Sequence, residues 1–180
     1  MRRRATLLLI FLILPASGSA LAEEEGPTFG RNVAGRVGIG VVAPEVPIGV
    51  RYCGTRRWGF EAGLGFVART GADDLTRIIL DGGGLIALAP GDRVNFYARP
   101  GARFTSENLN GKTTTTVQLN AAFSFEYFPF RDFSLTASTG LAVDFVSPPD
   151  SPDRTSFFVV GDTVTRVGFF FYLPRSKDRP

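Results

Sequence analysis

The chain carries few side chains that could support catalysis. It has 180 residues, no histidine and one cysteine, Cys53, so the commonest general base and zinc ligand is missing and an internal disulfide is excluded. Without a histidine, serines such as Ser124 and Ser134 have no base to activate them. A carboxylate mechanism on Glu61 or Glu126 is an alternative that no other feature supports. We therefore expect no enzymatic activity, no catalytic residue, no cofactor and no metal site.

Many of the other charged side chains alternate with apolar neighbours along extended segments. The set comprises Arg51, Arg57, Glu61, Arg69, Arg77, Asp81, Arg99, Arg103, Glu126, Asp144 and Arg166. We predict that it forms a polar network facing the lumen of a barrel. Its acids should pair with its arginines, because an unpaired buried charge is costly. Arginines outnumber acids in the set, so some should lie near the mouths or in water.

The segment Trp58–Arg69 shows the alternation most clearly. Its even positions are all apolar, and its odd positions are mostly glycine or charged. A period of two predicts a strand whose two faces meet different surroundings. Glycines mixed with isolated charges indicate a narrow, crowded, polar interior, so the apolar face is predicted to meet lipid.

Similar segments fill the rest of the chain, and none has a helical period. They are Arg36–Val42, Ile48–Cys53, Leu75–Ala89, Val94–Phe104, Val117–Tyr127, Phe133–Phe145 and Thr155–Leu173. Polar loops are predicted at Ser106–Lys112 and Ser147–Asp153. Eight strands is an even number, as a closed antiparallel barrel in a bacterial membrane requires. We predict an all-β fold over residues 33–173: a closed eight-stranded antiparallel up-and-down transmembrane β-barrel.

Aromatic residues sort toward the two ends of the predicted strands. One group lies near the predicted periplasmic ends of the strands, on the outward-facing register, and another lies near the opposite ends. Together they are Tyr52, Trp58, Phe66, Phe104, Tyr127, Phe133, Phe145, Phe169 and Phe171. Two such belts are expected where amphipathic rings meet the two interfaces of a membrane.

Residues 1–22 predict a signal peptide rather than a structural element. They have a basic start, a short apolar run and small residues before a cleavage site after Ala22. The run is too short for a membrane-spanning helix, which needs ~20 residues. A polar lead, 23–32, and a polar tail, 174–180, flank the predicted barrel. Cleavage removes three arginines and no acid, so the net charge of +3 falls to zero. Nucleic acid is therefore not an expected partner.

The chain resembles the small eight-stranded outer-membrane barrels of the OmpA/OmpX type. The resemblance rests on the signal peptide, on Trp58–Phe66 and on the aromatic segment Val167–Tyr172. It implies Sec export to the outer membrane of a Gram-negative-type bacterium, with membrane lipid and the outer-membrane assembly machinery as partners. In that family the machinery reads an aromatic residue at the end of the last strand. Here a tail follows it, so the signal is internal or altered.

Three interpretations of the function remain at this stage. The first is an outer-membrane barrel with a structural or surface-interaction role and a packed polar lumen, because an eight-stranded barrel is just wide enough to be filled by side chains. The second is a soluble periplasmic or secreted lipocalin-like barrel, with its apolar register lining a ligand pocket. The third is a narrow passive pore, in which the charged register selects a small solute. The ligand of the surface loops is not predicted.

Overall fold

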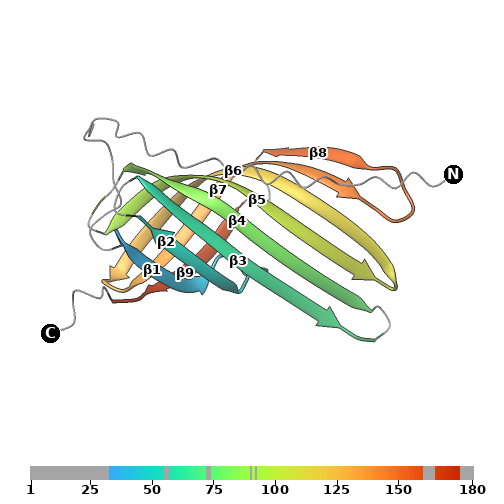
Figure 1. The fold of residues 1–180 in the computed structure, drawn as a ribbon, viewed down its shortest axis with the longest axis horizontal. Coiled ribbons are helices and arrows are strands. Elements are labelled where there is room, and N and C mark those ends of the chain that lie inside the picture. Colours follow the sequence, from blue (N-terminus) through green and yellow to red (C-terminus); the bar gives the residue numbers. More distant parts are fainter. Residues whose placement is uncertain are drawn as a thin grey trace.

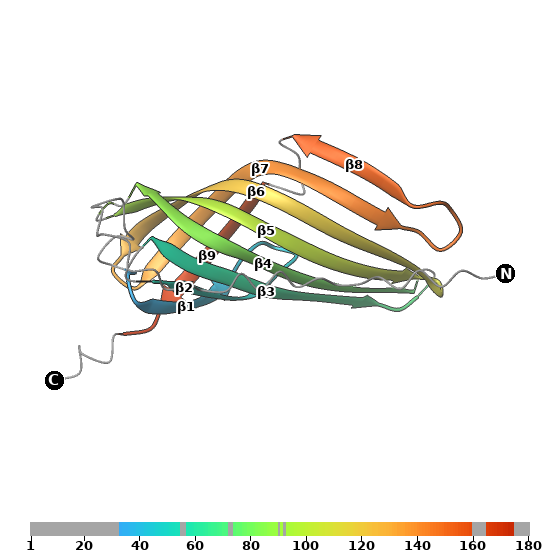
Figure 2. The same ribbon diagram turned by 45° about the horizontal axis from the view of Figure 1, so that its top comes forward.

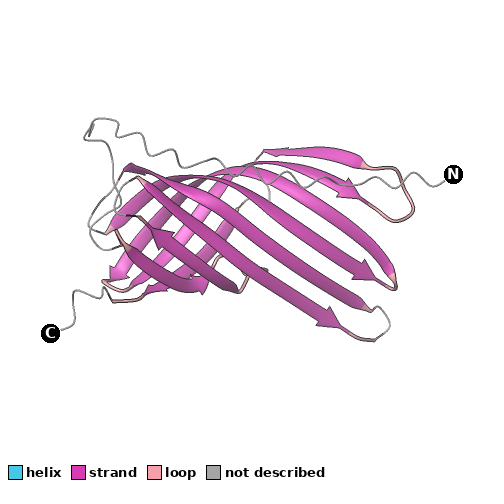
Figure 3. Ribbon diagram, viewed as in Figure 1, coloured by secondary structure: helices cyan, strands magenta, loops and turns pink. Residues whose placement is uncertain are grey.

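The described residues of the computed structural model are almost entirely β-strand (Figure 3). They are 33–54, 57–71, 74–89, 91, 93–159 and 165–174. Their strands are β1 (Arg36–Val41), β2 (Ile48–Cys53), β3 (Trp58–Arg69), β4 (Leu75–Ala89), β5 (Val94–Leu109), β6 (Lys112–Phe130), β7 (Phe133–Ser147), β8 (Arg154–Val159) and β9 (Arg166–Tyr172). The predicted signal peptide, the polar lead and nearly all of the tail lie outside this part of the chain.

Eight of these strands close into an antiparallel barrel (Figure 1). Strands β1 to β7 each pair with the next in sequence, and β9 pairs with both β7 and β1 to complete the ring. The predicted all-β class and the closed eight-stranded antiparallel barrel are therefore confirmed. We call the end where β1 begins and β9 ends the near end, and the opposite end, with the β3–β4 and β5–β6 connections, the far end.

The predicted eighth strand, Thr155–Leu173, is two strands instead of one. β8 pairs with the second half of β7, and β9 pairs with its first half. Between the pairs Ser138↔Arg166 and Leu141↔Val159, β7 has two residues and the other segment has six. A single strand cannot absorb this mismatch and keep its register. Among the described residues β8 pairs with β7 alone, at the end of the strand order.

The prediction of a loop at Ser106–Lys112 is wrong. β5 continues to Leu109 and β6 begins at Lys112, so only Asn110 and Gly111 form the turn. Their φ angles are 52° and 81°, and positive φ at both central residues defines the type I′ hairpin turn that Asn-Gly favours. The threonines that follow extend the strand, because β-branched residues pack well on a pleated surface. By contrast, 148–153 is a loop, as predicted.

The strands differ in length, so the barrel wall is uneven. β1 and β2 have six residues each, whereas β6 has 19. Figure 2 shows β3 to β7 extending well past the β1–β2 hairpin, with β8 at the margin of the long wall. The pairing of β2 with β3 ends at Ile48↔Leu64, beyond which β3 pairs with β4 alone among the described strands.

Burial alternates along most of the barrel wall and places charge inside and apolar groups outside. Arg51, Glu61 and Glu126 are at most 3% exposed, whereas Trp58 and Phe66 on the outer surface are 65% and 63% exposed. The described residues contain no helix that is long and apolar enough to cross a membrane.

The β1–β2 connection turns into the barrel. Val42, Ala43 and Val46 are almost completely buried there, and an isolated bridge joins Ala43 to Val46. Glycines on the inner face of the wall make room for this turn: a Cβ at Gly49 would lie 2.6 Å from the Val42 side chain, and one at Gly63 would lie 2.5 Å from Val46. The crowded interior predicted from the glycines of β3 is therefore formed partly by the chain itself.

Candidate functional site

The lumen holds a continuous series of ion pairs. Arg51 on β2 bridges Glu126 on β6 and Glu61 on β3, and its Nη1 lies 2.9 Å from Glu126 Oε1. Glu61 in turn pairs with Arg99 on β5, at 2.9 Å from Nε. Arg99 also pairs with Asp81 on β4. The series therefore joins five strands across the interior, which is what the predicted pairing of acids with arginines requires.

Glu126 anchors the end of the series nearer β7 and β9. It is fully buried and accepts hydrogen bonds from Ser134 Oγ and Tyr172 OH, both at 2.6 Å, and from Tyr97 OH. The Arg51 guanidinium lies over the Phe170 ring, 4.0 Å from its centroid. Both carboxylate oxygens thus have donors, so Glu126 stays satisfied without water.

Asp81 anchors the other end, where three arginines share one carboxylate. Besides Arg99, Arg103 Nε lies 3.0 Å from Asp81 Oδ2, and Arg166 Nη1 lies 3.0 Å from Oδ1. Arg103 also reaches Glu45 Oε1 at 2.9 Å, on the turn that enters the barrel. An ion pair therefore joins the inward turn to the lumen network.

The predicted polar network is only partly one cluster. Eight members are buried: Arg51, Glu61, Asp81, Arg99, Arg103, Glu126, Asp144 and Arg166. Of these, Asp144 accepts a hydrogen bond from Gln118 at 2.8 Å and joins no ion pair among the described residues.

The remaining three members lie toward the ends of the barrel. Arg77 pairs with Glu107 near the far end, where the two side chains are 38% and 32% exposed. Arg69 is exposed at the end of β3, and Arg57 is half-buried just before β3 begins. This is where the surplus arginines were predicted to lie.

Sequence reasoning missed several partners of the network. Glu45 lies between the predicted strands Arg36–Val42 and Ile48–Cys53, and only the glycines that face it indicate that this connection turns inward. Tyr97 and Tyr172 fall in the polar register, but a tyrosine also fits an interfacial belt, so the register alone did not single them out. Gly83 lies within the predicted strand Leu75–Ala89, and a Cβ there would lie 2.9 Å from the Arg99 guanidinium carbon, so the arginine needs glycine beside it.

The predicted interfacial aromatics all lie on apolar outer registers. At the near end Phe133 packs against Phe171 and Phe169, with ring centroids 4.8 Å and 6.1 Å apart. Toward the far end, Phe104 and Phe145 flank Val117 in neighbouring strands. The set is completed by Tyr52, Trp58, Phe66 and Tyr127, all exposed or half-exposed.

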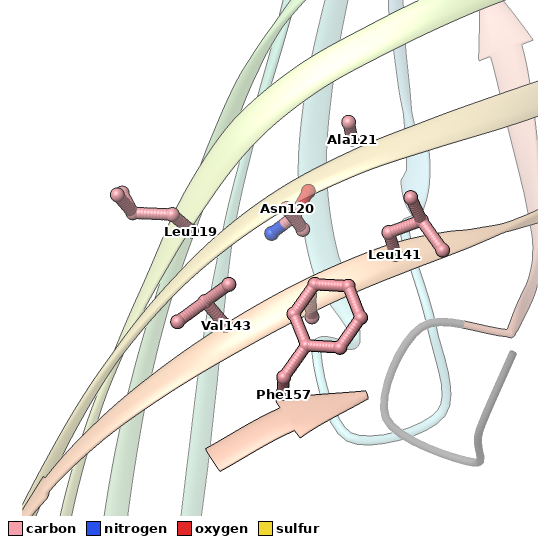
Figure 4. A pocket seen from close by; sticks show the side chains of 7 residues that line it. Leu119, Asn120, Ala121, Leu141, Val143 and Phe157 are labelled. Carbon is pink, nitrogen blue, oxygen red and sulfur yellow. The ribbon is translucent and has the colours of Figure 1, made fainter. Parts of the chain in front are cut away.

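A shallow apolar groove crosses the outer surface between β6, β7 and β8. Figure 4 shows Leu119, Leu141 and Val143 along it, with the ring of Phe157 beside them. Most of its side chains belong to the outward register, but its lining also includes Asn120 and Ala142, which are buried on the inward register.

This arrangement offers buried charges and hydrogen bonds, among them the contact between the Ser134 hydroxyl and the Glu126 carboxylate. In the described residues, no three histidine, cysteine, aspartate or glutamate side chains are grouped so that they could hold a metal ion. Comparisons of the chain with protein-family models, with curated proteins and with solved structures find no match.

Proposed function

We propose that this chain is an integral outer-membrane β-barrel with a structural or surface-interaction role and no catalytic activity. The observation that carries the proposal is the polarity of the wall. Large apolar side chains such as Trp58, Phe66 and Leu119 are at least half exposed, while the interior is charged. In water such an outer surface would be a large aggregation-prone patch, whereas in a bilayer it meets acyl chains.

The closed backbone supports the same proposal. A bilayer core has no water to bond free N–H and C=O groups, so spanning sheets must close. The described strands form such a ring. The aromatic rings at the near end would then sit at one membrane interface, with Phe171 facing out at the end of β9, where the assembly machinery would meet it.

The surface-interaction role would fall to the far end. There β5 and β6 extend as a polar hairpin ending at Asn110 and Gly111, and the loop 148–153 lies between β7 and β8. Lys112 at this hairpin pairs with Asp150 in that loop, 2.6 Å from Nζ to Oδ2. Exposed groups on a rigid scaffold are where binding usually resides.

The packed lumen favours this role over a passive pore. The ion pairs join opposite sides of the ring, and the β1–β2 turn occupies the lumen on their far-end side. Recording single-channel currents in a planar bilayer tests this directly: the proposal expects no steady conductance, and a stable ohmic step would favour the pore.

The first experiment separates lipid from water as the partner of the apolar surface. The chain without residues 1–22 is refolded with and without detergent micelles and analysed on a gel with and without boiling. The proposal expects a heat-modifiable band that forms only with detergent or lipid. A monodisperse, folded protein in plain buffer would overturn it and favour the lipocalin-like alternative.

A further inference from the structure

The lumen contains buried donors that the ion-pair network does not use. Arg103 Nη2, Arg166 Nε, Arg166 Nη2 and Asn120 Nδ2 are all buried and have no hydrogen-bond partner among the described residues. Each parent residue is at most 7% exposed. Such groups are rare in folded proteins, because an unsatisfied buried donor costs free energy, more so when it is charged.

The side chains that carry these donors are linked to one another through Asp81 and Arg99. Arg103 and Arg166 each lie 3.0 Å from a different oxygen of Asp81. Asn120 belongs to the same group, because its Oδ1 accepts a hydrogen bond from Arg99 Nη1 at 3.3 Å. Two guanidinium groups with unused N–H groups therefore contact one carboxylate, and an amide with an unused N–H contacts Arg99, which pairs with the same carboxylate.

The charges around Asp81 are unequal. Three arginines share Asp81, and Arg99 has a second acid in Glu61. Arg103 has its second acid only in Glu45, whose side chain is 37% exposed on the inward turn. Arg166 has no second acid among the described residues. Another acid in the lumen, Asp144, accepts a hydrogen bond from Gln118.

We propose that Arg103, Arg166 and Asn120 form a binding site for a small oxyanion, such as sulfate or a carboxylate, beneath the β1–β2 turn. Guanidinium groups bind oxyanions through paired, charge-assisted N–H donors. The Glu45 carboxylate already occupies part of Arg103 in the same way, so it competes with the anion. The site does not depend on whether the outer surface of the barrel meets lipid or water.

The test compares anions on the refolded chain at constant ionic strength. The unfolding midpoint is measured by Trp58 fluorescence against increasing sulfate, with chloride as the balancing anion and acetate as a second probe. Sulfate also stabilises proteins by general exclusion from their surface. The informative result is therefore a shift of the unfolding midpoint that saturates with sulfate, with acetate or with both. The anion concentration that gives half of this shift is the half-effect concentration.

Three variants should change the half-effect concentration in different ways. Arg166→Gln should raise the half-effect concentration about tenfold or abolish saturation, because it removes a charged donor of the bound anion. Glu45→Gln should lower the half-effect concentration, because the competing carboxylate is removed. Arg77→Gln removes one positive charge from the far end without touching the site, and should match the unmodified chain.

The side-chain Nε–H of Arg166 gives a second readout that needs no variant. Its NMR signal should shift with sulfate or acetate along the same saturating curve. If neither anion gives saturation in the unmodified chain and the signal stays still, the orphan donors are bound to water and the proposal is wrong. An equal response in Arg166→Gln would also overturn it.

Discussion

Replacing Glu126 with glutamine tests whether the lumen network stabilises the barrel. The substitution keeps the shape of the side chain but removes its charge. Arg51 loses the partner 2.9 Å from its Nη1, and the hydroxyls of Ser134 and Tyr172 lose a charged acceptor at 2.6 Å. Breaking a buried ion pair from one side costs about 3–5 kcal/mol.

Arg51 keeps Glu61 after the change, so the cost should fall at the lower limit of that range. We expect a loss of about 3 kcal/mol in the free energy of unfolding, which is on the order of a hundredfold in the equilibrium constant. The measurement is reversible urea unfolding in lipid vesicles, followed by the fluorescence of Trp58, the single tryptophan of the chain.

Glu107→Gln is the matched control. It breaks the ion pair with Arg77, whose side chains are 38% and 32% exposed, so it should cost less than about 1 kcal/mol. If Glu126→Gln costs no more than this control, the lumen ion pairs do not hold the barrel together and the reasoning fails. A double-mutant cycle with Arg51→Gln then measures the coupling of the pair itself.

Three further predictions concern the inward turn, the far hairpin and the outer surface. Gly65→Ala should expel the turn and make Glu45 susceptible to a glutamate-specific protease, because the new Cβ would overlap the Glu45 carbonyl oxygen. Gly84→Ala, with open space around its Cβ, is the control. Gly111→Ala should lower stability by about 1 kcal/mol in urea unfolding, since its φ of 81° disfavours any Cβ. Finally, brominated lipid should quench Trp58, whose side chain is 65% exposed on the outer surface.

Each of these has a result that contradicts it. Equal protease resistance in the two glycine variants would mean that the turn is held by other contacts. An unchanged urea midpoint in Gly111→Ala would mean that the hairpin does not need this turn type. Trp58 fluorescence that responds to acrylamide in water but not to bromine in the bilayer would place the apolar surface away from lipid.

Much of the fold follows from the sequence, because burial in a closed sheet repeats every second residue. The alternation in Trp58–Arg69 identifies which side chains face inward, and the buried positions of β3 follow it. The ends of the strands are harder to predict. Thr113 to Thr116 are polar, so they were interpreted as lying outside a strand, but polarity at the end of a strand reflects exposure to water rather than a lack of pairing.

The candidate site was predicted as a set of residues, not as an arrangement. Periodicity gives the face of each side chain but not its height in the lumen. It could not tell that Asp81 pairs with three arginines while Asp144 pairs with none in the part of the chain that the structure describes. The β8–β9 interruption was missed for a similar reason. It arises from a mismatch in residue number against β7, which only the pairing of the two segments reveals.

The ring is closed at the β1–β9 seam, which has the fewest residue pairs of the contacts that form the ring. β1 and β9 share four residue pairs, whereas β5 and β6 share sixteen. These two strands stand at opposite ends of the described chain, so joining them costs the most loop entropy for the fewest bonds. Arg36 joins the two strands there, because it donates hydrogen bonds to the carbonyl oxygens of Leu173 at 2.9 Å and Tyr172 at 2.7 Å. The hairpins between β3 and β7 can therefore form early and independently, and the seam should be the last contact made and the first to open.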